Sequence, residues 1–182
     1  MSPRPPLIEL QPRCRTQRLA QIELGRLVLL DAPRGAGLLA IRADALSAQG
    51  ELTEGVLRLD PAQPRFERRR LDDPLLSIDL EYLIEADLAS ARVRAPASGD
   101  LVLSRGAAAA GLWLAAPFGG SLLDLATALL RPYAADSAGP PRLALHWHLV
   151  ERAAHRRILF SHGGVAGEPA PPRAPPEDEE GD

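Results

Sequence analysis

Short apolar segments, separated by turn-forming residues, follow one another along most of the chain. They recur at roughly the 8–12-residue spacing that is typical of antiparallel sandwiches and barrels. The segments are RLAQIEL, RLVLLD, GLLAIRA, GVLRLD, SIDLEYLIEADL, ARVRAP, DLVLS and GLWLAA. This pattern predicts a mainly β fold, namely a β-sandwich or open barrel of antiparallel hairpins.

One segment alternates almost without exception. Between Ser77 and Leu88 the even-numbered residues are apolar and the odd-numbered residues are polar, except for Leu83. Successive residues of a strand point to opposite faces, so we expect one strand with a core face and an acidic face. The acidic face carries Asp79, Glu81, Glu85 and Asp87.

After this segment the alternation reverses its phase. A tight hairpin about Ala89-Ser90 explains the reversal, because it would pair Asp87 with Arg92 and Glu85 with Arg94. Each such pair stabilises a sheet by ~0.2–1 kcal/mol. Ala-Ser lacks the residue types that tolerate a positive φ, so a bulge within one long bent strand is the alternative.

One α-helix is expected, near residues 121–132. Ser121 is a typical N-cap, and Asp124 stands three residues later as an imperfect capping box. The leucines then recur at helical spacing on a wide face, so we expect this helix to be mostly buried. The face consists of Leu122, Leu123, Leu125, Ala126, Leu129 and Leu130.

All four histidines fall within a predicted hairpin over residues 142–162. An even-length turn places Trp147 opposite Phe160, whereas an odd-length turn places His146 opposite His162. Burial of the aromatic pair stabilises the even register by several kcal/mol, more than two histidines without a metal contribute. We therefore favour the even register, which scatters the histidines.

His146 and His148 share one face of their strand, because they lie two residues apart. Strand histidines with this spacing serve in some metal sites, so a metal-dependent enzyme using this pair is one alternative function. A closed zinc site needs two further ligands that the sequence does not single out. We expect half-exposed histidines and no resident metal.

Composition excludes several chemistries. All 21 basic residues are arginine, and the chain has neither lysine nor asparagine, which is typical of a GC-rich, bacterial genome. Without lysine there is no Schiff base, no phosphate-loop lysine and no lysine-attached cofactor. We expect no cofactor and no catalytic residues, since no motif for catalysis appears.

The charge and the hydropathy of the chain limit the classes of partner and the cellular location that we expect. The net charge of −3 and the aromatic content of 4% do not favour nucleic-acid binding. Cys14 is the only cysteine, so no intrachain disulfide forms. We find neither a signal peptide nor an apolar run of membrane-spanning length, so we expect a cytoplasmic protein, or an envelope protein if a precursor segment is missing.

Two glycine motifs resemble ligand loops. The Gly-x-Gly-x-x-Ala pattern of residues 35–40 resembles a dinucleotide fingerprint, but the residues after it alternate like a strand. Gly119-Gly120-Ser121 would bind an anion if it began a helix, although most such starts are merely capped. We expect turns at both places.

The ends of the chain differ from its centre. Residues 1–6 are rich in proline and arginine, and residues 164–182 are rich in proline and then acidic, so we expect both to be disordered. Residues 7–163 are predicted to form a single β-rich domain.

We therefore expect a non-catalytic binding or assembly protein that acts through a β-sheet face or edge on a protein partner or a second copy of itself. The tentative binding residues are the basic Arg68, Arg69 and Arg70 and the acidic Asp79, Glu81, Glu85 and Asp87. The alternative is a carrier of a small apolar ligand or lipid, held between sheet and helix. Its cavity would be lined by Trp113, Leu122, Leu125 and Leu129.

Overall fold

The computed structural model describes residues 14–30, 37–60, 63–103, 111–115, 120–133, 141–152 and 156–163. The predicted N-terminal arm, the predicted C-terminal tail, His155, Gly35 and Gly119 lie outside these ranges. The single domain over residues 7–163 stays a prediction.

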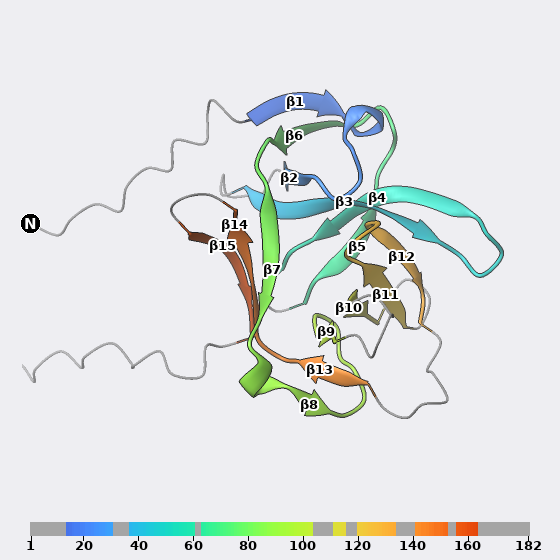
Figure 1. Ribbon diagram of the computed structural model, residues 1–182. Coiled ribbons are helices and arrows are strands. Elements are labelled where there is room, and N and C mark those ends of the chain that lie inside the picture. The colour runs from blue at the N-terminus through green and yellow to red at the C-terminus, as the bar shows by residue number, and fades with distance from the viewer. Residues whose placement is uncertain are drawn as a thin grey trace, which may run out of the picture.

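The described chain is mainly β and folds into two sheets that are mostly antiparallel (Figure 1). In spatial order, the main path of the large sheet is β1 (Cys14–Arg18), β6 (Pro74–Ile78), β2 (Leu27–Leu30), β3 (Leu38–Leu46), β12 (Leu129–Pro132), β11 (Ser121–Asp124), β10 (Gly111–Leu114), β9 (Leu101–Val102), β13 (Arg142–Ala144) and β8 (Arg92–Val93). A further strand, β4 (Leu52–Arg58), pairs with β3 and with β5 (Arg65–Arg68). The three-stranded small sheet has the order β15 (Arg157–His162), β14 (Trp147–Glu151), β7 (Tyr82–Ala86).

The predicted helix over residues 121–132 is wrong. This segment forms the antiparallel hairpin of β11 and β12, which lies between β10 and β3. Asp124, assigned above to a capping box, accepts hydrogen bonds from the backbone N–H groups of Ala126 and Thr127 at 2.8 and 3.4 Å. Such bonds favour turns over helices. The turn ends at Ala128, whose φ of 54° is rare outside glycine.

The leucine spacing of this segment fits a strand as well as a helix. Leu123 and Leu130 lie opposite each other in the hairpin, and both are buried in the core. Short apolar runs are compatible with both periods, so the sequence pattern does not choose between them. The neighbouring strands β10 and β3 determine the outcome, because they form hydrogen bonds with the two outer edges of the hairpin. In the described chain the helical segments are the two 3-10 turns η2 (Leu19–Gln21) and η3 (Leu88–Ser90).

The alternating segment 77–88 is divided between the two sheets. β6 belongs to the large sheet and β7 to the small one, and Asp79–Glu81 connects them as a crossover. The predicted core face is confirmed from Ile78 to Ala86, but Leu88 is 63% exposed in η3, and the single strand is wrong. The even-numbered residues that pack in one core cluster are Ile78, Leu80, Tyr82, Ile84 and Ala86.

The predicted hairpin about Ala89-Ser90 is also wrong. Residues 88–90 form η3, and β7 pairs with β14 whereas β8 pairs with β13. The expected pair of Glu85 with Arg94 does not form, because Arg94 binds Asp100 at 2.8 Å. Asp87 does not meet Arg92 across a hairpin but accepts a hydrogen bond from the first turn of η3.

The β14–β15 hairpin forms, but its register differs from the predicted one, and Ile158 lies on the opposite face. Trp147 lies opposite His162 and Leu149 opposite Phe160, with an irregularity between Leu149 and Val150. From Trp147 to Leu149 the pairing is displaced by two residues from the even register, so these side chains keep their faces. Beyond the irregularity Ile158 lies opposite Val150 and not opposite Leu149, where the even register places it, so Ile158 has changed to the opposite face. Both aromatic residues therefore still point into the core.

Trp147 joins the two sheets. It is fully buried, and its indole N–H donates to the backbone carbonyl of Gly99 at 2.8 Å. Its ring lies 5.3 Å from the Phe160 ring and 5.6 Å from the His162 ring, between centroids. The same core cluster includes Ile41 and Leu57 of the large sheet, so one apolar layer holds both sheets.

Candidate functional site

The small sheet has one face in the core and one face outside it. Trp147 and Leu149 of β14 belong to the core cluster, so Val150 points to the opposite face. Leu83 of β7 and Ile158 of β15 pair with Val150 from its two sides. We call Leu83, Val150 and Ile158 the apolar row, and the face that carries it the outer face.

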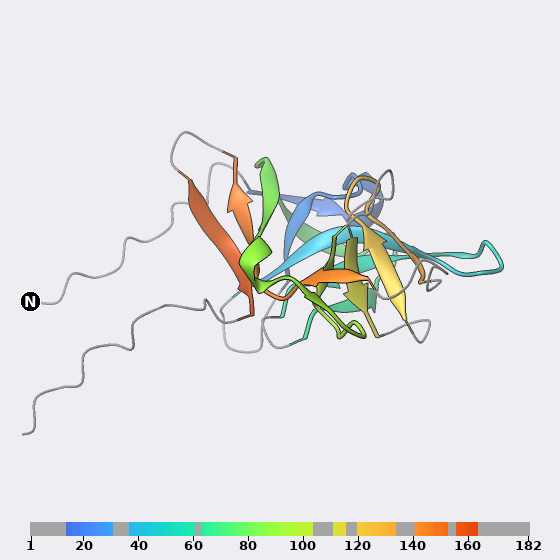
Figure 2. The ribbon, with the colours of Figure 1, turned by 60° about the horizontal axis from the view of Figure 1, so that its bottom comes forward.

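The apolar row is open at both ends. Leu83 is 39% exposed and Ile158 is 53% exposed, whereas Val150 between them is 1% exposed. Figures 1 and 2 place the small sheet on the left of the molecule with the large sheet on its core side, and no described element lies beyond it. Among the described residues, the row therefore has no covering segment.

Acidic and basic side chains flank the apolar row and come from different strands. The acidic groups belong to the chain of β7 and its ends, and the basic groups belong to the ends of β14 and β15. The pairs are Glu81 with Arg152 at 3.8 Å, Asp87 with His146 at 3.9 Å, and Glu85 with Arg156. Because β14 lies between β7 and β15, the Arg156 side chain reaches across β14 to Glu85.

The structure brings three of the four predicted acidic residues to the rim of the outer face. Glu81, Glu85 and Asp87 lie there, each beside a basic group. Asp79 lies in the crossover and pairs with Arg26 of the β2 end at 3.0 Å. Two of the three rim carboxylates are therefore held in ion pairs with arginines, and the third, Asp87, lies beside an imidazole.

The predicted arginines lie on another part of the fold. Arg68 ends β5, and the next two arginines follow that strand. Arg69 pairs with Glu67 at 3.0 Å, and Arg70 pairs with Asp72 at 3.3 Å. β5 pairs with β4 and is not part of the small sheet, so the basic and acidic candidates do not form one site.

The histidines do not converge. The Nδ1 atom of His148 lies 2.9 Å from the Ser161 hydroxyl, and His146 lies beside Asp87. His162 points the other way and stacks on Trp147. In the ranges that the structure describes, no three His, Cys, Asp or Glu side chains gather as metal ligands.

Sequence reasoning missed the apolar row. One signal was available, since Leu83 is the one apolar residue on the polar side of the alternating segment. Nothing similar marks Val150 and Ile158, because their strand assignments depend on the irregular pairing between β14 and β15.

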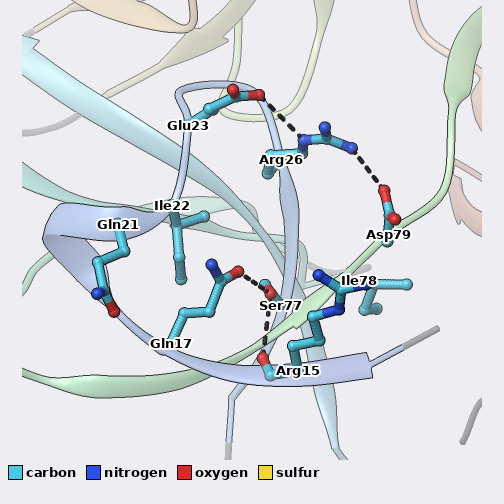
Figure 3. A pocket seen from close by; sticks show the side chains of 9 residues that line it. All are labelled: Arg15, Gln17, Gln21, Ile22, Glu23, Arg26, Ser77, Ile78 and Asp79. Carbon is cyan, nitrogen blue, oxygen red and sulfur yellow. Dashed lines mark hydrogen bonds and ion pairs between the residues drawn. The ribbon is translucent and has the colours of Figure 1, made fainter. Parts of the chain in front are cut away.

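A polar cavity of about 190 Å³ lies beside the crossover (Figure 3). It lies between β1, β6 and the segment that leads to β2, and it is lined by Arg15, Gln17, Gln21, Ile22, Glu23, Arg26, Ser77, Ile78 and Asp79. Arg26 bridges Glu23 at 3.3 Å and Asp79 at 3.0 Å. The Ser77 hydroxyl lies 3.0 Å from the Arg15 carbonyl oxygen, which it reaches as a donor. Two arginines and two carboxylates line this cavity, so their charges balance.

A second cavity of about 390 Å³ lies on the other side of Arg26, which lines both. Its remaining lining residues are Leu24, Gly25, Leu80, Glu81, Tyr82, Leu125 and Arg152. The Tyr82 hydroxyl donates to the Gly25 carbonyl at 2.6 Å, and burial raises the pKa of Tyr82 to about 12. Leu125, one of the residues predicted to line a ligand cavity between sheet and helix, lines this second cavity. The predicted helix, however, is replaced by the β11–β12 hairpin.

The glycine motifs behave as turns or strand starts where the structure describes them. Gly37 leads directly into β3, so no helix follows it as a dinucleotide site requires. Ser121 is buried at the start of β11, so it does not present a helix N-terminus to an anion.

No helix in the described ranges has the length and apolarity needed to cross a membrane. A scan against protein-family models found no match to this chain, and searches of curated proteins and of solved structures found no significant match either.

Proposed function

We propose that this protein is a non-catalytic binding or assembly protein that acts through the outer face of its small sheet. The observation that carries the proposal is the apolar row, whose ends Leu83 and Ile158 stay exposed on a sheet face that no described segment covers. Full burial of a leucine or isoleucine side chain contributes ~1.5–3 kcal/mol. A partner that covers both ends of the row would gain a useful part of this free energy.

We propose a sandwich as the architecture that presents this face. Support comes from the core cluster, which takes residues from both sheets and is centred on Trp147. In such an arrangement each sheet has one inner and one outer face. The outer face of the small sheet is then a rigid platform and not a loop.

A second candidate function is the carriage of a small amphipathic ligand in the cavity of about 390 Å³. Leu24, Leu80 and Leu125 line this cavity together with the charged Arg26, Glu81 and Arg152, so it offers both apolar and charged contacts. Its volume falls within the range of roughly 300–1,000 Å³ that ligand pockets occupy. If a ligand binds there, Leu125→Trp should fill the space and abolish the binding of a fluorescent fatty acid, and unchanged binding would exclude this site.

Site-specific photo-cross-linking in the source cells tests the main proposal. A photoreactive amino acid replaces Ile158 in one variant, Leu83 in a second, and Leu71 in a control. Leu71 is 46% exposed but lies outside the small sheet. We expect adducts from the first two positions and none from Leu71, and equal adducts from all three would contradict the proposal.

A further inference from the structure

We infer that the polar cavity beside the crossover binds a small zwitterion, a molecule with one carboxylate and one ammonium group a few atoms apart. This cavity of about 190 Å³ belongs to the large sheet (Figure 3). The inference therefore goes beyond the proposed function and does not depend on the outer face of the small sheet. Its basis is a pair of opposite charges that the ion pairs of the cavity leave uncompensated.

The positive charge belongs to Arg15. Figure 3 shows its side chain rising from β1 on the side of Ile78 and Asp79, and the residue is exposed. Within the described ranges, the two carboxylates that line the cavity pair with Arg26 and not with Arg15. The guanidinium group of Arg15 therefore keeps its charge for a ligand.

The negative charge belongs to Glu23, Arg26 and Asp79, which we call the Arg26 triad. One guanidinium group lies between two carboxylates, 3.3 Å from Glu23 and 3.0 Å from Asp79. Two negative charges and one positive charge leave the triad with a net charge of −1. The two carboxylate side chains are 78% and 65% exposed, so a ligand can reach them although both already contact Arg26.

Gln17 supplies a further donor beside Arg15. The two residues lie two positions apart on β1, so they share a face of the strand. The Ser77 hydroxyl shares its hydrogen between the Arg15 carbonyl oxygen at 3.0 Å and the Gln17 carboxamide oxygen at 2.5 Å. This contact turns the carboxamide nitrogen away from Ser77 (Figure 3). A guanidinium group and an amide NH₂ group together suit a carboxylate, which only accepts hydrogen bonds.

The size of the cavity limits the ligand to a few heavy atoms. Its volume lies below the range of roughly 300–1,000 Å³ that is typical of pockets for drug-sized molecules. Ile22 and Ile78, which are 5% and 3% exposed, add apolar lining. A small zwitterion satisfies both uncompensated charges at once, whereas a simple anion or cation satisfies one and is repelled by the other.

An NMR titration of the isotope-labelled full chain tests binding at low ionic strength, because salt screens exposed charges. The probes are glycine, 4-aminobutyrate and 6-aminohexanoate, which differ in the distance between their charged ends, and butyrate and butylamine, which each lack one charge. We expect at least one zwitterion to shift the backbone amides of Arg15, Ser77 and Asp79, but not that of Arg131, and to bind more tightly than butyrate or butylamine. Zwitterions that leave these amides unshifted, or that bind no better than the singly charged probes, would overturn the inference.

Arg15→Gln tests the carboxylate end of the ligand. Arg15 is exposed on the edge strand β1, so the variant should keep the fold, which the same spectra report. We expect the dissociation constant of the best zwitterion to rise at least about tenfold, since a charge-assisted hydrogen bond is lost. The matched control is Arg131→Gln, which removes an exposed arginine of β12 that lines neither cavity and should leave the affinity unchanged. Equal affinity in both variants would contradict the role of Arg15.

Asp79→Asn tests the ammonium end. The substitution brings the net charge of the Arg26 triad to zero, so 4-aminobutyrate should lose its advantage over butyrate. Asp72→Asn is the matched control, because the Asp72 side chain is 68% exposed and pairs with Arg70 outside the cavity. This control should keep the preference for the zwitterion. A preference that persists in Asp79→Asn would overturn the assignment of the ammonium group to the triad.

Discussion

The outer faces of the two sheets differ in whether a further segment of the chain covers their apolar side chains. On the large sheet, Ala40 and Val56 point away from the main core, yet both are fully buried. Leu19 and Ile22, from η2 and its end, pack against them in a second apolar cluster. On the small sheet, the apolar row has no such cover among the described residues, and its ends stay exposed.

The difference indicates where a partner is needed. A sheet face with apolar side chains is stabilised when another layer covers it. The chain supplies that layer itself for the large sheet, through the segment between β1 and β2. It supplies none in the described ranges for the small sheet, which is why we assign the partner to that side.

The covered face also buries an ion pair, and its loss should have the largest effect on stability. Arg42 and Asp44 are both buried, and the Arg42 guanidinium donates to Asp44 and to the Gly55 carbonyl. Asp44→Ala leaves a buried cation unpaired, which typically costs ~3–5 kcal/mol of unfolding free energy. Urea denaturation of the variant and the wild type measures this loss of unfolding free energy. The control is Glu54→Ala on the neighbouring strand, a partly exposed residue for which we expect a small loss.

Truncating one side chain on each outer face should show directly that the covered face contributes more to the free energy of unfolding than the uncovered face. Leu19→Ala removes a fully buried side chain from the second cluster and should lower the free energy of unfolding by ~2–5 kcal/mol. Ile158→Ala removes a similar volume from the uncovered face and should change the monomer by less than ~0.5 kcal/mol. Equal losses in dilute solution would show that the small sheet is covered after all.

Alkaline pH should weaken the inner face of the small sheet. Burial raises the pKa of Tyr82 from 10.0 to about 12, so the folded state favours the neutral phenol. That contribution is complete below pH 10 and is lost as the pH rises through about 12, by ~2–3 kcal/mol in total. Tyr82→Phe should flatten this part of the stability profile, and a profile unchanged by the substitution would argue against the buried phenol as its source.

The smallest expected effect concerns packing beneath Trp147. A Cβ added at Gly99, where φ is +97°, would lie 2.2 Å from the His162 ring, whereas a Cβ at Gly50, where φ is +82°, meets nothing within 4 Å. Gly50→Ala therefore reports backbone strain alone, ~1 kcal/mol. Gly99→Ala adds the steric conflict and should shift the thermal midpoint further down. Identical shifts would mean that His162 moves aside freely.

Much of the fold could be predicted from residue patterns. The β class, the core face from Ile78 to Ala86 and the inward position of Trp147 follow from alternation between apolar and polar positions. The helix near residues 121–132 could not be excluded, because its leucines fit two periods. The partners of β7 and the displaced β14–β15 register could not be predicted either, since they depend on strands distant in sequence.

Only part of the candidate site could be predicted from residue patterns. Glu81, Glu85 and Asp87 were identified as a group, but Arg152, Arg156 and the apolar row were not. Alternation reports which residues share a face of one strand, and it does not report which strands lie next to one another. A site assembled from β7, β14 and β15 therefore lies beyond the reach of local patterns.

What the sequence by itself determined is which residues of an uninterrupted strand share a face, because side-chain direction alternates along an extended chain until a bulge or turn interrupts it. What only the tertiary structure decided is the neighbourhood of each residue: the crossover at Asp79–Glu81, the hairpin in place of a helix, and the open row from Leu83 to Ile158. The physical reason is that hydrogen-bonded pairing and layer contact join segments far apart in the chain, and their free energy depends on the whole arrangement.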